Sequence, residues 1–137
     1  MALADRIDGL LHEPTQVHDG GVDLTAAAVS RVTVPARVDF GGGELTGADR
    51  EPVETRLRNP DDDYGWWHLD AGTYLVEYNE SLSGDGEVLL QTRDAVRERG
   101  AFHPTLRTTS LDPVPFVVGG AGLLLKENAR LSTVSLP

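Results

Sequence analysis

The sequence predicts an all-β protein made of one domain, residues 1–137. A chain of this length fits a single domain and buries about two-thirds of its unfolded surface, so it needs no metal or disulfide for stability. Glycine pairs, Asn-Pro and Gly-Asp-Gly divide most of it into segments too short for helices. Several of these segments alternate or carry β-forming residues, a pattern typical of a β-sandwich or barrel.

The first element is predicted to be a short amphipathic helix over residues 2–11. Its apolar residues lie at i, i+4, i+7 and i+8, which places them on one helical stripe: Leu3, Ile7, Leu10 and Leu11. We expect this helix to end before Pro14, because a residue that precedes proline is biased away from the helical conformation.

Six further segments are predicted as strands: 29–34, 66–69, 73–78, 87–92, 122–126 and 130–136. In 73–78, Tyr74, Val76 and Tyr78 share one face because side chains alternate along a strand. Residues 94–99 instead indicate one or two helical turns, begun by Asp94 and ended by Gly100. The polar stretch 40–63 lacks periodicity and is either a long loop or a frayed hairpin, functional or disordered.

Charge and composition exclude several function classes. Twelve Lys and Arg face 22 Asp and Glu, a net charge of −10 that argues against a nucleic-acid partner. Lys126 is the only lysine, which together with the acid excess favours adaptation to high salt over an ordinary acidic surface. Without cysteine, thiolate chemistry is excluded. With no bilayer-length apolar run and no secretory signal, we expect a cytoplasmic protein that does not bind membranes.

Three short motifs carry a resemblance to a known family. Gly21-Val22-Asp23-Leu24 is similar to an early G/S-V-D-L strand, residues 69–76 to an L-x-x-G-x-Y/F strand entry, and residues 79–82 to the x-E-x-I that follows it. Together they resemble the trimeric dCTP deaminase and dUTPase superfamily, whose haloarchaeal members are also acidic. The resemblance implies a distorted jelly roll or β-barrel that forms homotrimers, with active sites between subunits.

Residues 93–100 stand in the place of the family's R-S-S-L-x-R-x-G phosphate motif. Arg93 and Gly100 keep their spacing, whereas Asp94 and Ala95 replace the serines and Glu98 replaces the second arginine, with Arg97 and Arg99 on either side. The resemblance implies phosphate binding by Arg93 with Arg97 or Arg99, next to Asp94 and Gly100. Asp94 would repel a phosphate unless Mg²⁺ bridged them; alternatively, it only caps the helical turn.

Residues 109–116 resemble the family's D-x-G-Y/W hairpin, which reads the pyrimidine. The resemblance makes Asp112 the candidate for water activation and Phe116 the candidate aromatic residue beside the base. Val114 replaces the glycine that allows close backbone approach, and Pro115 is extra. The other interpretation of Asp112 is an Asp-Pro turn.

Glu127 has two alternative interpretations. Counted from Gly122, it falls where deaminases carry the glutamate that shuttles protons. Residues 126–131 also resemble the family's E-x-G-A-R-I turn, in which case Glu127 is an exposed turn residue and the deaminase strand is deleted. The second alignment is favoured.

The motifs together indicate a protein that handles pyrimidine deoxynucleoside triphosphates, by dUTP hydrolysis or dCTP deamination, with Mg²⁺ aligning the phosphates. The alternative is a paralogue that kept the trimeric scaffold, lost its chemistry and serves as a binding or regulatory partner. The four histidines are scattered and show no metal-ligand spacing, so no protein-held metal site is predicted.

Overall fold

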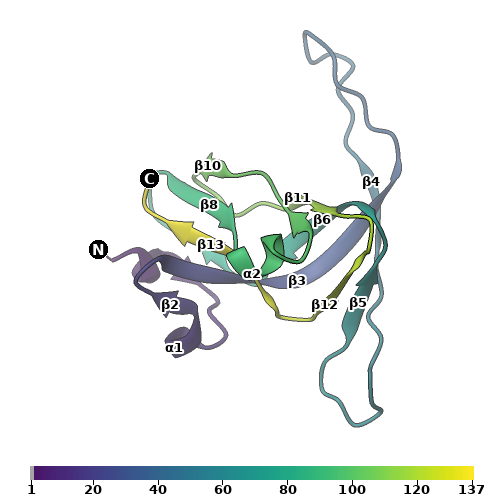
Figure 1. Cartoon of the computed structure of the whole chain (residues 1–137). Coiled ribbons are helices and arrows are strands. Elements are labelled where there is room, and N and C mark those ends of the chain that lie inside the picture. The colour runs from purple at the N-terminus through teal and green to yellow at the C-terminus, as the bar shows by residue number, and fades with distance from the viewer. Residues whose placement is uncertain (1) are drawn as a thin grey trace.

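The computed structural model describes residues 2–137 and confirms the all-β class (Figure 1). Antiparallel strands curl into a half-barrel whose main sheet has the order β10-β8-β13-β3-β6-β11-β9, with β2 and β4 also paired to β3. The strands of this sheet are β2 (Val17–His18), β3 (Gly21–Val34), β4 (Asp49–Pro52), β6 (Gly72–Tyr78), β8 (Val88–Thr92), β9 (Ala101–Phe102), β10 (Leu106–Thr108), β11 (Val114–Val118) and β13 (Arg130–Ser135). Two smaller sheets pair β1 (Ile7–Asp8) with β7 (Ser81–Leu82) and β5 (Trp66–Leu69) with β12 (Leu123–Lys126).

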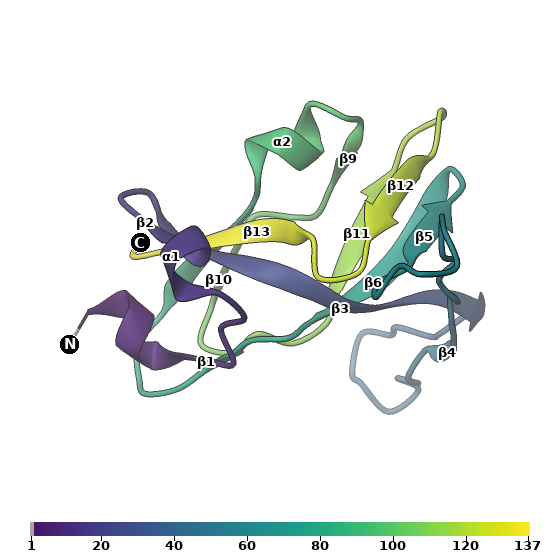
Figure 2. The same ribbon diagram turned by 90° about the horizontal axis from the view of Figure 1, so that it is seen from below.

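Strand β3 is the spine of the fold. It is 14 residues long and runs through the middle of the molecule in Figure 2. Its first part pairs with β13 and its later part with β6 and β4. Leu24, Ala26 and Val29 from this strand are fully or almost fully buried. One continuous strand therefore joins the two ends of the half-barrel.

The core lies inside the curled sheet. As predicted, Tyr74, Val76 and Tyr78 of β6 point inward together, while Thr73 and Glu77 are exposed. Phe116 of β11 and Leu131 of β13 are completely buried with them. Burial of these large apolar side chains supplies most of the stabilisation that such a fold requires.

The N-terminal segment differs from the predicted helix. Only Leu3–Arg6 is helical, as a 3₁₀ turn, and Ile7 then enters β1 and pairs with Leu82 of β7. Gly9 has φ +87°, which breaks any helical continuation. Pro14 does not end a helix but lies in the first turn of α1 (Glu13–Gln16), where its missing N–H costs nothing.

A buried polar cluster fastens α1 to the sheet. Gln16 is 2% exposed; its Oε1 accepts from the backbone N–H groups of Leu11 and His12, and its Nε2 donates to the Asp23 carbonyl and to Glu80. Glu80, also 2% exposed, accepts from the backbone N–H and the hydroxyl of Thr25. Every polar atom of the Gln16 side chain is therefore satisfied, as burial demands.

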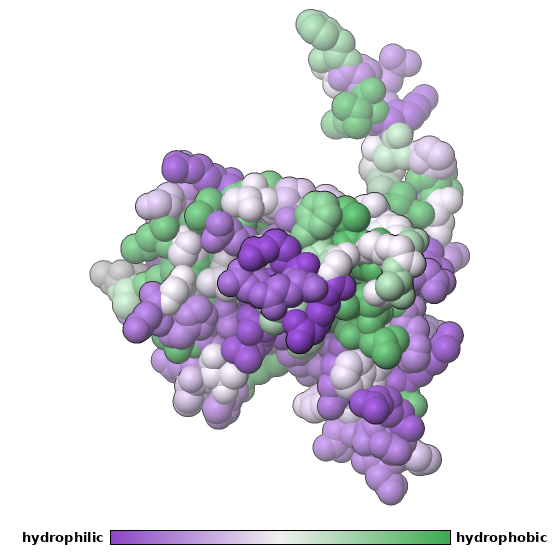
Figure 3. Space-filling model, in the orientation of Figure 1, coloured by the Kyte–Doolittle hydropathy of each residue, from purple (hydrophilic) through white to green (hydrophobic). Residues whose placement is uncertain are grey.

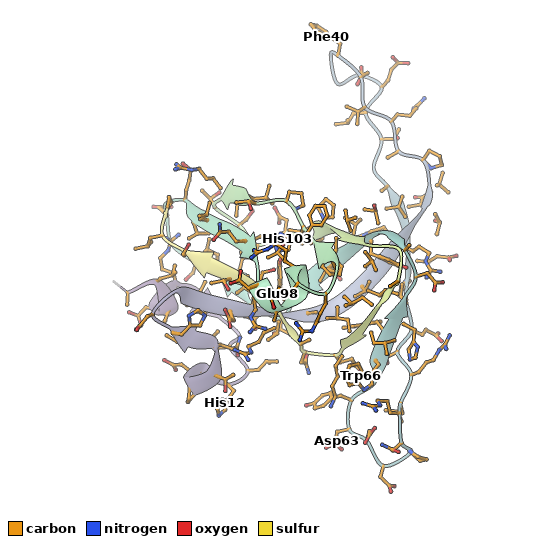
Figure 4. All side chains as sticks on the ribbon, viewed as in Figure 1. His12, Phe40, Asp63, Trp66, Glu98 and His103 are labelled. Carbon is orange, nitrogen blue, oxygen red and sulfur yellow. The ribbon has the colours of Figure 1, made fainter. Side chains whose placement is uncertain are left out.

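Residues 40–63 fold as a hairpin followed by a second extended segment, so the hairpin alternative agrees with the structure. Strand β4 pairs with the end of β3, and residues 35–48 between them project from the body with Phe40 near the tip (Figure 4). Residues 53–65 project on the opposite side, where Asp63 lies. Phe40 is fully exposed, and the projecting hairpin carries mixed hydrophobic and hydrophilic residues (Figure 3).

The two helices of the main body are short, α1 and α2 (Asp94–Arg97). Within residues 2–137, none of the helices has the length and apolar character needed to cross a membrane.

Candidate functional site

Arg93 lies where β8 ends and α2 begins. Its backbone N–H donates to the carbonyl of Leu131 on β13 at 3.0 Å. Its guanidinium donates through Nη1 to the Arg130 carbonyl at 3.0 Å and lies with Nε 3.4 Å from Oδ2 of Asp23. The side chain is 23% exposed, so it is anchored at both ends yet still reaches solvent.

Asp23 of β3 is the centre of this cluster. Its side chain is only 3% exposed. Oδ1 accepts from Nε2 of His18 and from the hydroxyl of Thr133, both at 2.7 Å. Oδ2 accepts from Nη1 of Arg130 at 3.1 Å and faces Arg93. The buried carboxylate is therefore held by two cations and two neutral donors, as a buried charge requires.

The local sequence explains why Asp23 is so placed. Strands β2 and β3 form a tight hairpin in which His18 pairs with Gly21, and this brings the imidazole over the carboxylate. Gly21 has φ +137°, and a Cβ there would collide with the backbone carbonyl oxygen of Val134 on β13. The glycine thus lets β13 approach closely enough for Thr133 to reach Asp23.

A surface hollow of about 480 Å³ opens beside Asp23 and the two arginines. We call it the arginine hollow. It lies between α1, the β2–β3 turn, β8, α2 and β13, and its lining comprises Thr15, His18, Gly20, Asp23, Gln91, Thr92, Arg93, Asp94, Ala95, Arg130 and Thr133. Half-buried guanidinium groups at the edge of an open hollow suit an anionic ligand with planar or tetrahedral oxygens.

The formal charges in the arginine hollow cancel. Arg93 and Arg130 contribute two positive charges, Asp23 and Asp94 two negative ones. The contacts of His18 assign it the neutral tautomer, because Nδ1 accepts from the backbone N–H of Gly20 while Nε2 donates to Asp23. The hollow therefore attracts a bare polyphosphate only weakly, and a polyphosphate whose charge is partly neutralised by a cation is repelled less by the two carboxylates.

The other predicted phosphate ligands surround α2 and are more exposed. Asp94 is 78% and Arg97 61% exposed at the side chain, and they pair with each other at 2.9 Å. Arg97 also lines a neighbouring hollow of about 390 Å³. Arg99 folds back to donate to the Ala95 carbonyl at 2.8 Å, and Gly100 ends the turn with φ +88°. The structure thus brings Arg93 and Asp94 into the arginine hollow, while Arg99 and Gly100 lie outside its lining.

Asp112 and Phe116 lie apart from the arginine hollow. Asp112 is exposed in the loop between β10 and β11 and accepts from the hydroxyl of Ser110 at 2.8 Å. Phe116 is 0% exposed and pairs with Tyr74 across β11 and β6. Its ring packs in the core, so the expected contact between Phe116 and a base does not agree with its burial.

Glu127 lies in the turn between β12 and β13, the position that the turn alternative predicts. Its Oε1 accepts from the backbone N–H of Gly65 at 2.8 Å, and its own N–H donates to the Gly65 carbonyl at 3.0 Å. Asn128 follows with φ 64°, a conformation that asparagine tolerates in turns. Glu127 is half-buried rather than exposed, because this pair of hydrogen bonds ties it to the β4–β5 segment.

A second titratable cluster lies in the core. Nδ1 of His103 donates to the Pro104 carbonyl at 2.8 Å, so Nε2 accepts from the hydroxyl of Ser132 at 2.7 Å. Ser132 in turn accepts from the hydroxyl of Tyr78 at 2.6 Å. Burial lowers the pKa of His103 and raises that of Tyr78. Since Ser132 is 0% exposed, these hydrogen bonds form a core network, and Ser132 is not a nucleophile with His103 as its base.

The residues present do not form a cage for a resident Mg²⁺. Within residues 2–137, no three His, Asp or Glu side chains gather with metal-binding geometry. Oδ1 of Asp23 accepts two hydrogen bonds, Oδ2 accepts one from Arg130 and is ion-paired with Arg93, and Asp94 is exposed and paired with Arg97. Magnesium prefers several oxygen ligands in a near-octahedral shell. The described residues therefore offer no preformed set of ligands for Mg²⁺ beside the hollow.

Asp23, Arg130 and His18 were not predicted as site residues. Asp23 and Arg130 belong to segments that resemble family motifs, Gly21-Val22-Asp23-Leu24 and residues 126–131, and this was the signal available. What the sequence does not contain is their pairing, because Asp23 and Arg130 are 107 positions apart.

No family model matches the chain. Two curated proteins do resemble it. A "Probable deoxyuridine 5'-triphosphate nucleotidohydrolase" from Methanosarcina mazei is 27% identical over 135 residues, which cover 91% of this chain and 74% of that protein. A protein of the same description from Methanococcoides burtonii is 28% identical over 108 residues, which cover 77% of this chain and 58% of that protein.

Proposed function

Because the chain is a member of the dUTPase-like superfamily, we propose that it binds pyrimidine deoxynucleoside triphosphates, with their phosphates in the arginine hollow. The observation that carries this proposal is the placement of Arg93. It is half-buried, anchored by its backbone and its guanidinium, and it faces an open hollow of about 480 Å³. Such a pre-positioned guanidinium recognises phosphate oxygens without first having to be ordered.

Among the reactions of the family, we favour hydrolysis of dUTP to dUMP and pyrophosphate. Deamination would need Glu127 as a proton shuttle, but its carboxylate is engaged by the backbone of Gly65. Hydrolysis needs a base for the attacking water, and Asp112 is an exposed carboxylate whose Oδ2 accepts from the Ser110 hydroxyl at the surface, which leaves Oδ1 to face solvent water. The water then attacks the α-phosphorus as its proton passes to Asp112, the bond from the α-phosphorus to the oxygen bridging it to the β-phosphorus breaks, and pyrophosphate leaves with that oxygen.

The separation of Asp112 from the arginine hollow supports a homotrimer. Asp112 is not among the residues that line this hollow, so a single copy does not offer both groups to one nucleotide. In a homotrimer with sites between subunits, the Asp112 loop of one copy would face the hollow of its neighbour. We propose this arrangement, in the cytoplasm, as the working form of the protein.

The charge balance of the hollow supports Mg²⁺ as a component of the substrate. Among the residues that line the hollow, the formal charges of Arg93 and Arg130 balance those of Asp23 and Asp94, although the ion pair of Asp94 is with Arg97, outside this lining. A bound Mg²⁺ reduces the charge of the triphosphate by two and weakens its repulsion by Asp94. The proposed ligand is therefore the magnesium complex of the nucleotide.

One observation favours the second candidate, a paralogue that binds or regulates without catalysis. Asp94 stands where the family has a phosphate-binding serine, and it is 78% exposed at the edge of the arginine hollow. A carboxylate here opposes phosphate binding, whereas a serine supplies a donor. In this candidate the scaffold and its assembly are retained while turnover is lost.

Turnover and binding assays separate the two candidates. The purified protein is incubated with dUTP or dCTP and Mg²⁺ across a KCl series up to molar concentrations, because the net charge of −10 suits high salt. Pyrophosphate and ammonia report hydrolysis and deamination, calorimetry reports binding, and sedimentation reports the trimer. We expect pyrophosphate without ammonia from dUTP. Neither turnover nor nucleotide binding at any salt concentration would refute the proposal.

Arg93→Ala tests whether the arginine hollow is the phosphate site. The matched control is Arg50→Ala, which removes the same charge from the exposed strand β4, away from α2 (Figure 1). We expect Arg93→Ala to weaken binding of Mg·dUTP at least about tenfold, because a hydrogen-bonded charge pair is worth about 1.5–3 kcal/mol. Equal losses in both variants would show that only net charge matters.

A further inference from the structure

We propose that Asp23 is a positioning residue that fixes Arg93 and Arg130 as a pair of phosphate-binding guanidiniums, which makes Arg130 a second phosphate ligand. The inference rests on the proposed function and deepens it. Asp23 itself does not touch the nucleotide. Its carboxylate contacts both guanidinium groups, and Arg93 and Arg130 both line the arginine hollow.

The geometry of the shared oxygen carries this inference. Oδ2 of Asp23 lies 3.1 Å from Nη1 of Arg130 and 3.4 Å from Nε of Arg93. One atom thus brings together guanidiniums from β13 and from the start of α2, which would otherwise repel each other. The opposite oxygen is held by His18 and Thr133, so the carboxylate cannot rotate freely.

Both arginines keep donors for a ligand. Within residues 2–137, Arg93 uses Nε and Nη1 for Asp23 and the Arg130 carbonyl, and its Nη2 has no protein partner. Arg130 uses Nη1 for Asp23, with a long contact of 3.5 Å to the Thr15 carbonyl, and its Nε and Nη2 remain. Because both side chains line the arginine hollow, these donors are available to phosphate oxygens.

Positioning is the role that fits this carboxylate, for two reasons. First, Oδ1 accepts two hydrogen bonds and Oδ2 accepts one from Arg130 and is ion-paired with Arg93, so a metal ion would have to displace an arginine, His18 or Thr133. Second, an arginine has many rotamers, and holding it in place removes the entropy cost that binding would otherwise include. Asp23 therefore lowers the net positive charge of the hollow but holds the guanidinium groups of Arg93 and Arg130 in place.

The sign of the effect of Asp23→Asn separates the possible roles. If Asp23 contributed only its charge, the substitution would remove a negative charge near an anion and strengthen binding. If Asp23 were a metal ligand, the loss would shrink as Mg²⁺ is raised. Positioning predicts weaker binding at every Mg²⁺ concentration, because the arginines lose their shared anchor.

The experiment measures calorimetric affinity for Mg·tripolyphosphate and for Mg·dUTP over a range of free Mg²⁺. The variants are Asp23→Asn, Arg130→Ala, their double variant and Arg130→Lys, with Arg50→Ala as the charge-matched control. Arg130→Lys keeps the charge but loses the planar fork, and it keeps the test open should Asp23→Asn fail to fold. Circular dichroism of each variant verifies folding before binding is measured.

We expect Asp23→Asn and Arg130→Ala each to weaken Mg·tripolyphosphate binding at least about tenfold. The fold-loss of affinity in the double variant should be much smaller than the product of the two single fold-losses, because both substitutions disrupt the same arrangement of arginines. Arg130→Lys should also lose affinity, while Arg50→Ala stays near wild type. Wild-type affinity in Asp23→Asn or in Arg130→Ala, tighter binding in Asp23→Asn, or its rescue by Mg²⁺ would overturn the inference.

The two probes distinguish failure of this inference from failure of the proposed function. Wild-type protein that binds Mg·dUTP, with variants that bind it equally well, overturns the positioning role and leaves the function standing. Wild-type protein that binds tripolyphosphate through Asp23 and Arg130 but shows no preference for dUTP supports the arginine pair and removes the nucleotide function. Binding of neither probe overturns both.

Discussion

Substitution of Gln16 by leucine tests the buried polar cluster that fastens α1 to the sheet and contacts the backbone carbonyl of Asp23. The side chain is 2% exposed and makes four hydrogen bonds. Leucine is similar in size but makes none of them. The N–H groups of Leu11 and His12 are near solvent and can turn to water, but the Asp23 carbonyl and the Glu80 carboxylate lose a donor inside the protein.

The expected loss follows from those two acceptors. Each buried group that loses a donor costs about 1–3 kcal/mol, so Gln16→Leu should lower the free energy of unfolding by roughly 2–6 kcal/mol. A domain of this kind has only about 5–15 kcal/mol in total. At about 3 °C per kcal/mol for a chain of this length, the melting temperature should fall by roughly 6–18 °C.

This loss is measured by thermal and urea unfolding, monitored by circular dichroism and by the fluorescence of Trp66 and Trp67. The matched control is Gln91→Leu, because Gln91 is exposed on β8 and should change stability by less than about 0.5 kcal/mol. A fall of less than about 3 °C for Gln16→Leu, or equal falls for both variants, would refute the reasoning.

Gln16→Glu is a sharper version of the same test. It keeps the shape but places a carboxylate where Nε2 now lies 2.9 Å from Oε2 of Glu80. Two like charges at this distance repel by about 6 kcal/mol at an effective dielectric constant of 20. We expect a larger loss than for leucine at neutral pH, which shrinks in acid as one carboxyl takes up a proton. No such recovery in acid would contradict the buried contact with Glu80.

Three further predictions follow from contacts described above. Asp94→Ser should raise the affinity for Mg·dUTP, measured by calorimetry, roughly fivefold, or about 1 kcal/mol, because an exposed carboxylate that repels the phosphates is removed. Unchanged or weaker binding would count against phosphate binding beside α2. Gly21→Ala should cost more than about 4 kcal/mol in urea unfolding or prevent folding, because the Cβ meets a carbonyl of β13, whereas Gly120→Ala, in open space, should be nearly neutral. Burial lowers the pKa of His103, so below about pH 6.5 the unfolded chain takes up a proton that the folded chain does not. The contribution of His103 to the free energy of unfolding should therefore be full above about pH 6.5 and decrease below it. His103→Gln should remove this part of the acid sensitivity measured by thermal unfolding, and an unchanged pH profile would show that the core network with Ser132 does not control it.

The strands that could be predicted from the sequence are those with a clear local pattern. Residues 66–69 were predicted as a strand and β5 has the same bounds, while β6 and β8 differ from the predictions by one residue. By contrast, only 29–34 of β3 was predicted from β-forming residues. Residues Ala26, Ala27 and Ala28 have little β preference, and it is pairing of Ala26 and Ala28 with β6 that makes this stretch part of a strand.

The N-terminal helix shows the opposite error. The spacing of Leu3, Ile7 and Leu10 favours a helix, yet Ile7 is buried through pairing with Leu82, 75 positions along the chain. Long-range pairing of this kind leaves no local pattern. The same reason explains the candidate site: Arg93 follows from its motif, whereas its tie to Asp23 through a shared oxygen is a tertiary contact.

The projecting hairpin has a consequence for how this chain can change over evolutionary time. From Arg31 to Pro52, no side chain is buried, and only Asp39 is even partly shielded. Lengthening a loop costs little free energy when its residues contribute nothing to the core. Insertions and deletions should therefore accumulate between β3 and β4 among descendants of this sequence. The first third of β3 cannot drift in this way, because Gly21 has no room for a side chain, Val22 pairs with both β2 and β13, and Asp23 and Thr25 make buried hydrogen bonds.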